Sequence, residues 1–163
     1  MNADQLADVV AGVSDPEIDV GLRDLGVLRS LSLTGDRIEV HLAPTRLGCP
    51  AFGEIARRVR SALTDAAPGH AVEIVWDRGA WQPAAVTPDG RTALRMAGYR
   101  VAGTAPRCPY CGGEDVVRAG RFGGAVCKVP YDCRGCGSLF DVIGTAGCSA
   151  VHPALDSVQG GSS

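Results

Sequence analysis

Two pairs of cysteines constrain the C-terminal part of this chain more than any other feature of the sequence. Cys108 and Cys111 form the first pair, and Cys133 and Cys136 form the second after 21 intervening residues. In a C-x-x-C turn both thiolates can reach one ion, and the glycine that follows each pair permits the positive φ that aims backbone N–H groups at sulfur. Two such turns complete a tetrahedral four-sulfur site, and their spacing is close to that of zinc ribbons.

The chemistry of this four-cysteine site is either that of a redox or iron–sulfur centre or that of a structural zinc ion. Four thiolates leave no open coordination position, which favours structural zinc. A segment this short also needs a metal, because it cannot bury a sufficient core of its own. We therefore expect a zinc ribbon at 107–143, preceded by a linker at 99–106 that contains Gly103 and Pro106.

Composition and the start of the sequence bear on the compartment. The first residues include Asp4 and Asp8 and no basic segment followed by an apolar core, so we expect no signal peptide. No apolar run approaches the length of a membrane span. Both observations predict a cytoplasmic protein, in which the seven cysteines favour metal binding over disulfides. Basic residues that are nearly all arginine, with abundant Ala, Gly and Val, favour a bacterial source.

Residues 1–98 have the pattern of a small α/β (α+β) domain with the element order α-β-β-α-β. From apolar periodicity and turn residues we expect these elements: a helix at 3–12, strands at 26–33 and 37–43, a helix at 50–64 and a strand at 71–77. The first two strands should form a hairpin. The third should run parallel to its predecessor, because a right-handed helical crossover joins them.

Two further segments complete the chain. Thr87 and Pro88 predict the N-cap and the first turn of another helix, and Gly98 is placed to end it. Residues 144–163 show no periodicity, so we expect a disordered tail.

Cys49 is the candidate functional residue of the first domain. It precedes Pro50 at the expected start of a helix, where backbone N–H groups and the helix dipole lower the pKa of a thiol. It is therefore either reactive or metal-binding, or an inert small hydrophobe. The hairpin could bring Asp15, Glu17 and Asp24 to the same end of the sheet, as in a transient metal or cluster site. The alternative, favoured by these residues alone, is that Asp15 and Asp24 only hydrogen-bond their own loops.

Other polar residues give weaker signals. Cys127 lies beside Lys128 and is either a thiol whose pKa the ammonium lowers or a small buried side chain. His41 alternates with apolar residues and should face away from the core, and the histidines are weak ligand candidates. The sequence contains no phosphate-binding loop, no Glu-x-x-His pair and no evident catalytic triad. We expect a protein that turns over no substrate by itself.

The charge balance argues against a nucleic-acid partner. The formal net charge of the chain is −2. Within 101–143 five basic residues oppose four acidic ones, which leaves one net positive charge and no surface that could follow a phosphate backbone. Contact with another protein is the better expectation for the ribbon.

Several motifs, taken in order, resemble those of a known family. The motifs are Asp15-Pro16-Glu17-Ile18, Asp24-Leu25-Gly26-Val27-Leu28-Arg29, Thr45-x-x-x-Cys49-Pro50, Trp81, Thr87-Pro88-Asp89-Gly90-Arg91, the two cysteine pairs, Arg121-Phe122-Gly123 and Cys127-Lys128. The first three resemble the iron–sulfur assembly domain of cluster-targeting factors. The whole set, over residues 6–142, resembles the PaaD-type accessory subunits of phenylacetyl-CoA epoxidase. Asp19 departs from the pattern, because the family usually has proline there.

The resemblance implies an iron–sulfur-assembly-like α/β domain followed by a four-cysteine zinc ribbon. It further implies a non-catalytic role in maturing or supporting a multicomponent oxygenase. The partners would be the di-iron oxygenase, the iron–sulfur flavin reductase or both, with no nucleic acid and no membrane. It also implies that Cys49 is functional, with Asp15 and Glu17 beside it and with Asp24, Thr45, Cys127 and Lys128 as accessory residues.

Three functional hypotheses follow. The first is a maturation factor in which Cys49 transiently holds iron or an iron–sulfur cluster while the zinc ribbon docks the client. The second is a structural subunit that only scaffolds the oxygenase. The third is a thiol–disulfide enzyme that uses Cys49 or Cys127. We rank it last because neither cysteine belongs to a C-x-x-C pair.

Overall fold

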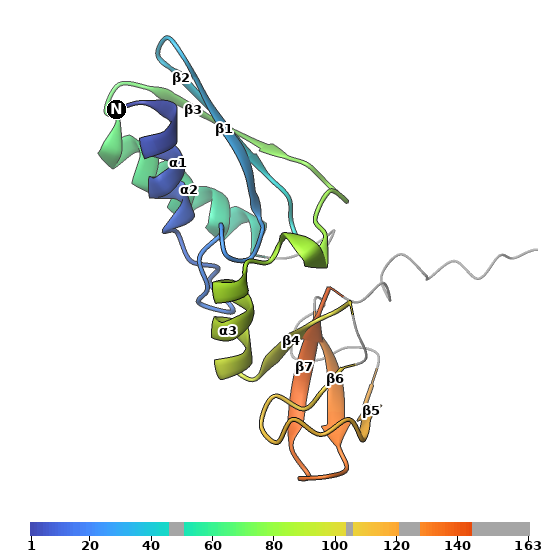
Figure 1. Ribbon diagram of the computed structural model, residues 1–163. Helices are drawn as coiled ribbons and strands as arrows, with labels where there is room; N and C mark the ends of the chain where they lie inside the picture. The colour runs from blue at the N-terminus through green and yellow to red at the C-terminus, as the bar shows by residue number, and fades with distance from the viewer. Residues whose placement is uncertain (46–50, 104–105, 121–127, 145–163) are drawn as a thin grey trace, which may run out of the picture.

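The computed structural model describes residues 1–45, 51–103, 106–120 and 128–144. Its helices are α1 (Ala3–Ala11), α2 (Phe52–Ala66) and α3 (Pro88–Met96), with a short 3-10 turn η1 (Pro83–Ala85). Its strands are β1 (Leu28–Thr34), β2 (Arg37–Leu42), β3 (Ala71–Trp76), β4 (Tyr99–Val101), β5 (Val116–Arg118), β6 (Lys128–Cys133) and β7 (Leu139–Ile143). The strands form two separate sheets (Figure 1).

The first sheet has the order β1-β2-β3, with α1 and α2 packed on one face (Figure 1). β1 and β2 form the expected antiparallel hairpin, which turns at Gly35, a residue with a φ of 60°. β3 runs parallel to β2, with Val40 opposite Ile74. The α-β-β-α-β order and the parallel crossover are therefore confirmed.

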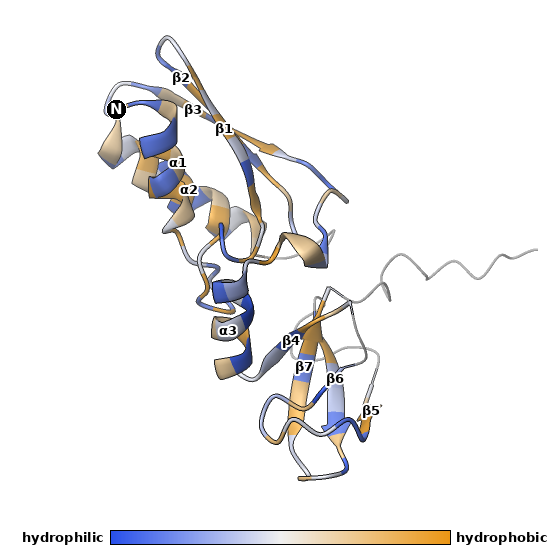
Figure 2. Ribbon diagram, in the orientation of Figure 1, coloured by the Kyte–Doolittle hydropathy of each residue, from blue (hydrophilic) through white to orange (hydrophobic). Residues whose placement is uncertain are grey.

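The helix-facing side of this sheet forms the larger core. Alternate residues of β2, Ile38, Val40 and Leu42, are fully buried, while the residues between them face the opposite side of the sheet. Val59 and Leu63 of α2 pack onto them, and their burial stabilises the fold by about 1.5–3 kcal/mol for each side chain. Figure 2 shows apolar residues, in orange, along both the strands and the helices of this part of the molecule.

The second sheet has the order β4-β7-β6-β5 and contains the two cysteine pairs. The expectation of a linker at 99–106 is wrong for residues 99–101, because these form β4 and pair in parallel with β7. Tyr99 and Val101 are partly buried against the larger core, which fixes this short strand. Its partner lies far along the chain, so a local pattern that contains Gly103 and Pro106 cannot reveal the pairing.

α3 lies between the two sheets and has the predicted ends (Figure 1). The Thr87 hydroxyl accepts a hydrogen bond from the Gly90 N–H at 2.9 Å and caps the helix. Gly98, with a φ of 83°, follows the last turn, as expected. Ile143 at the end of β7 is buried in the larger core, so the second sheet contributes to it. Within the described residues no helix combines the length and the apolar character needed to cross a membrane.

Candidate functional site

The four predicted ligands converge at one end of the second sheet. The Sγ atoms of Cys108 and Cys136 are 3.6 Å apart, as are those of Cys111 and Cys133, and all four lie within 4.8 Å of one another. With Zn–S bonds of about 2.3 Å, tetrahedral coordination places sulfurs about 3.8 Å apart. Cys108 and Cys133 are buried, whereas Cys111 and Cys136 are exposed. The geometry therefore fits one tetrahedral metal ion.

Backbone and hydroxyl donors surround the exposed thiols. The Gly113 N–H points at the Sγ of Cys111 at 3.4 Å, and the turn that brings it there has a φ of 74° at Gly112. This N–H lowers the pKa of the Cys111 thiol. Hydrogen bonds with the Cys136 and Cys133 thiols act in the opposite direction and prevail, so that the pKa is raised to about 12. The Cys111 thiol therefore stays protonated near neutral pH unless a cation is bound.

Ser138 is a contributor that the spacing argument missed. Its hydroxyl lies 3.3 Å from the Sγ of Cys136, and the hydroxyl and backbone N–H together lower the pKa of Cys136 to about 6. The signal in the sequence is the position two residues after the last cysteine, where a serine can reach back to the sulfur. Both donors favour the thiolate that a metal requires.

Asp15 holds the loop between α1 and β1. Its Oδ1 accepts hydrogen bonds from the N–H groups of Glu17 at 2.8 Å and Ile18 at 3.1 Å, and its side chain is buried. Asp19 closes the same turn with a φ of 55°, which a proline ring cannot adopt, so the loop differs here from the usual family pattern. Glu17 is exposed on this turn.

Asp24 contacts the start of α3. Its Oδ1 accepts a hydrogen bond from the Thr87 hydroxyl at 2.7 Å, and its backbone carbonyl accepts from the Thr87 N–H at 3.0 Å. Asp24 therefore joins its loop to a helix from a distant part of the chain. It does not act only within its own loop, as the simpler alternative expected.

The hairpin does bring two of the predicted segments to one end of the sheet. Leu28 pairs with Leu42, and the Ala43 N–H donates to the Val27 carbonyl at 2.7 Å. The loop before β1 and the segment after β2, which reaches half-buried Thr45, therefore lie side by side. Cys49 lies outside the described residues.

Lys128 is buried in the second sheet. Its Nζ donates to the Tyr99 hydroxyl at 3.2 Å and lies 4.7 Å from the centre of that ring. The ammonium thereby links β6 to β4, a structural role that adjacency to Cys127 did not predict. Cys127 lies outside the described residues.

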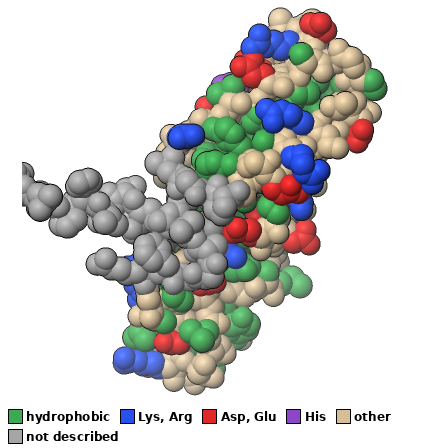
Figure 3. All heavy atoms as spheres, turned by 180° about the vertical axis from the view of Figure 1, so that it is seen from behind, with side chains coloured by type: hydrophobic (Ala, Val, Ile, Leu, Met, Phe, Trp, Pro, Cys, Tyr) green, Lys and Arg blue, Asp and Glu red, His purple; other side chains and the backbone are tan. Residues whose placement is uncertain are grey.

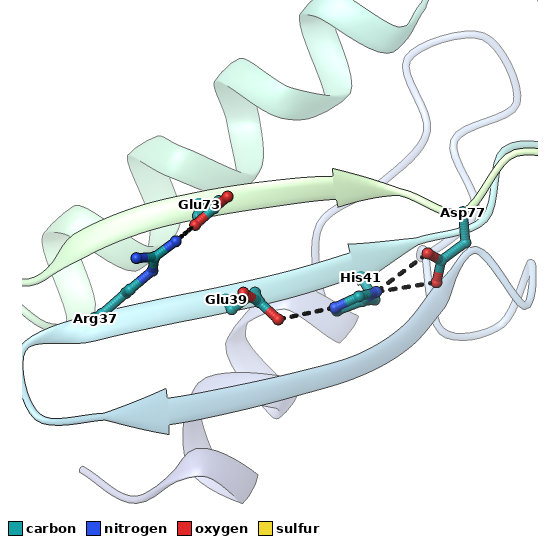
Figure 4. Close-up of polar contacts among 5 residues, drawn as sticks. All are labelled: Arg37, Glu39, His41, Glu73 and Asp77. Atoms are coloured by element: carbon teal, nitrogen blue, oxygen red, sulfur yellow. Dashed lines mark hydrogen bonds and ion pairs between the residues drawn. The ribbon is translucent and has the colours of Figure 1, made fainter.

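His41 faces the uncovered side of the first sheet, as expected, and lies between two carboxylates (Figure 4). Its Nδ1 is 3.1 Å from Oδ2 of Asp77, and its Nε2 is 3.0 Å from Oε1 of Glu39. Hydrogen bonds to Glu39 and then to Asp77 raise the pKa of His41. Since both ring nitrogens have partners, the ring fixes the sheet surface instead of presenting a ligand atom.

Comparison with known proteins places these two modules in one family. Residues 3–76 match the model for iron-sulfur cluster assembly proteins, and residues 98–144 match the PaaD zinc beta ribbon domain. A protein of Escherichia coli (strain K12), named as one subunit of a "Putative 1,2-phenylacetyl-CoA epoxidase", is 30% identical over 143 residues, which cover 82% of this chain and 87% of that protein. The chain belongs to the PaaD-type family. The ribbon match begins just before β4, in agreement with the place of β4 in the second sheet.

Two further similarities each cover about half of the chain. An iron-sulfur cluster carrier protein of Deinococcus radiodurans is 36% identical over 84 residues, which cover 50% of this chain and 24% of the carrier. A solved domain of unknown function (DUF59) from Bacillus anthracis covers 56% of this chain and 90% of its own length, with a TM-score of 0.50 and 24% identity. At this level of identity, that structure supports only the fold of this PaaD-type chain and says nothing about its role.

Proposed function

We propose that this protein is a non-catalytic maturation factor for a phenylacetyl-CoA epoxidase, one that assists the insertion of iron or an iron–sulfur cluster into an oxygenase or reductase component. The observation that carries the proposal is the pairing, in one chain, of an iron–sulfur assembly domain with a PaaD ribbon. The similarity to the epoxidase subunit extends over 87% of that subunit's length. Similarity of half of the chain to an iron–sulfur cluster carrier also supports a role in handling iron–sulfur clusters.

In this proposal Cys49 is the residue that holds the cargo. Its sequence position, after Thr45 and before a helix start, suits a thiolate, and iron and clusters bind thiolate sulfur readily. Glu17 is the exposed carboxylate of the Asp15 turn and a second donor, while Asp15 holds that turn. The proposed accessory residues are Thr45 and Asp24 in the first domain and Cys127 and Lys128 in the ribbon.

The ribbon is the proposed docking module, with Cys108, Cys111, Cys133 and Cys136 holding a structural zinc ion. The ion would supply folding energy and no reaction chemistry. On the face seen in Figure 3, the described basic and acidic side chains are interspersed, which supports a protein partner better than a polyanion. The partners would be the di-iron oxygenase, the iron–sulfur flavin reductase or both.

Metal analysis after anaerobic purification tests the cargo role. We expect the wild-type protein, loaded with iron and sulfide, to retain both alongside zinc, and Cys49→Ser to lose the iron and sulfide but keep the zinc. Serine preserves size and hydrogen bonding but is a far poorer ligand for soft metals. Equal iron and sulfide in both proteins would remove Cys49 from the proposal.

A structural scaffold is the second candidate. It is favoured by the contacts of Asp15 and Asp24, both of which hold loops. A scaffold tolerates Cys49→Ala and Cys49→Ser, whereas deletion of the protein lowers the activity even of fully metallated oxygenase components. Activity assays with metallated components, in the presence and absence of this protein, distinguish the two roles.

A further inference from the structure

Residues 81–98, which join the two sheets, pack tightly against the loop before β1. The indole Nε1–H of Trp81 donates to the Leu25 carbonyl at 2.7 Å in a buried hydrogen bond. A Cβ atom placed on Gly26 would lie 2.5 Å from the Cβ of Ala85, and Gly26 has a φ of 68°. Only glycine fits that position, so the approach of the two segments is built into the sequence.

The start of α3 repeats this pattern. Thr87 bonds the side chain and the carbonyl of Asp24, and a Cβ on Gly90 would lie 2.2 Å from the same carbonyl oxygen. The first turn of α3 therefore rests directly on the backbone of Asp24. This contact and that of Trp81 fix the segment to the assembly domain at two points.

The same segment contacts the ribbon at two further points. A Cβ on Gly144, which follows β7, would lie 2.4 Å from the Trp81 ring. A Cβ on Gly98, at the end of α3, would lie 2.5 Å from the hydroxyl of Tyr110. Tyr110 stands between Cys108 and Cys111, so the first cysteine turn touches the end of α3.

We propose that residues 81–98 form a strut through which metal binding in the ribbon orders the Asp24–Val27 loop, with Trp81 as its main positioning residue. Trp81 contacts Leu25 of that loop on one side and Gly144 of the ribbon on the other. Val27 in turn accepts the Ala43 N–H, which carries the effect to the end of β2. The inference stands whether the protein matures its client or scaffolds it.

The two states that the strut connects are the metal-bound and metal-free ribbon. Metal binding to such a module is folding free energy, so the cysteine turns and the end of β7 lose their order when the metal leaves. Coupling between two sites is reciprocal. If metal binding orders the strut, a weakened strut must lower the metal affinity by the same factor.

Zinc affinity of the full chain, measured by competition with a chromophoric chelator, tests the inference. Trp81→Phe removes the indole N–H and shrinks the ring, and we expect zinc binding to weaken by about tenfold, within the usual range of coupling between sites. The matched control is Trp76→Phe, since Trp76 lies in β3, outside the strut, and stacks on Phe52 of α2 at 4.6 Å. We expect wild-type affinity for the control.

Amide hydrogen exchange of the wild-type chain supplies a second readout. Removal of zinc should accelerate exchange at the N–H groups of Val27, Ala43 and Thr87, and leave that of Val59 in α2 unchanged. If Trp81→Phe fails to fold, Thr87→Val decides, because it removes the hydrogen bond from the strut to Asp24 and changes no ribbon residue. Wild-type zinc affinity in the folded strut variant, or unchanged exchange at Thr87 on zinc removal, would overturn the proposal.

Discussion

At the scale of single residues, Asp15 and Asp24 of the assembly domain hold loops in place. Asp15 accepts two N–H groups of its own turn, and Asp24 accepts the hydroxyl of Thr87. A carboxylate that accepts such hydrogen bonds fixes its loop. If it were left buried without donors, the cost in free energy would exceed what the hydrogen bonds contribute. These residues fix the loop between α1 and β1.

Thr87 offers the sharpest residue-scale test of this positioning. Thr87→Val keeps the side-chain shape but removes both the helix cap and the bond to Asp24. We expect a loss of about 1–2 kcal/mol in the free energy of unfolding, measured by urea denaturation. Thr87→Ser retains the hydroxyl and should stay close to the wild type. Equal stabilities for the valine and serine variants would show that the contact is unimportant.

His41 makes stability depend on pH. Glu39 and then Asp77 raise the pKa of His41 above its ordinary value near 6.5. The stabilisation is thus fully present below about pH 6.5 and is lost as the pH rises through the higher folded-state value. Ser30 and Ser32, which pair with His41 and Glu39 from β1, add no charge beside the imidazole.

The measurement is the free energy of unfolding of the wild type and His41→Gln across this pH window. We expect the wild type to lose more stability than the variant between about pH 6.5 and the folded-state pKa. Parallel curves for the two proteins would show that the two carboxylates do not stabilise the imidazolium.

At the scale of elements, patterns within short stretches and the crossover between β2 and β3 were predicted, whereas two contacts with distant parts of the chain were missed. Alternation in β2 and capping by Thr87 arise from neighbouring residues, so the sequence contains them. The cysteine spacing brought four ligands together because each turn is local. β4 was missed because its strand pairing comes from β7, far along the chain. The Trp81–Leu25 bond was missed for the same reason, as no periodicity marks an indole donor.

The ribbon supplies the element-scale prediction. Cys133→Ser removes one of four ligands, so residues 107–143 should unfold, because the metal stabilises this module. β1, β2, β3, α1 and α2 should persist. Limited proteolysis should release a fragment cut after α3, while the zinc-loaded wild type resists cleavage there. Simultaneous digestion of the whole variant would show that the modules fold as one unit and would reject the proposed boundary.

At the scale of the whole molecule, two modules meet without a long flexible connection. Ile143, Tyr99 and Val101 of the second sheet join the larger core, and α3 spans the gap between the sheets. The four-cysteine ribbon and the assembly domain are therefore held in a fixed relation. This arrangement suits a protein that docks a client with one module and presents cargo with the other.

The metal content of the client tests the maturation role most directly. Cells that carry Cys49→Ala should make the oxygenase components in normal amount, but with little iron or cluster. Reconstitution of the purified components with iron and sulfide should then restore epoxidation without this protein, because maturation acts before turnover. Fully metallated components from the Cys49→Ala cells, or reconstituted components that stay inactive until this protein is added, would contradict the account.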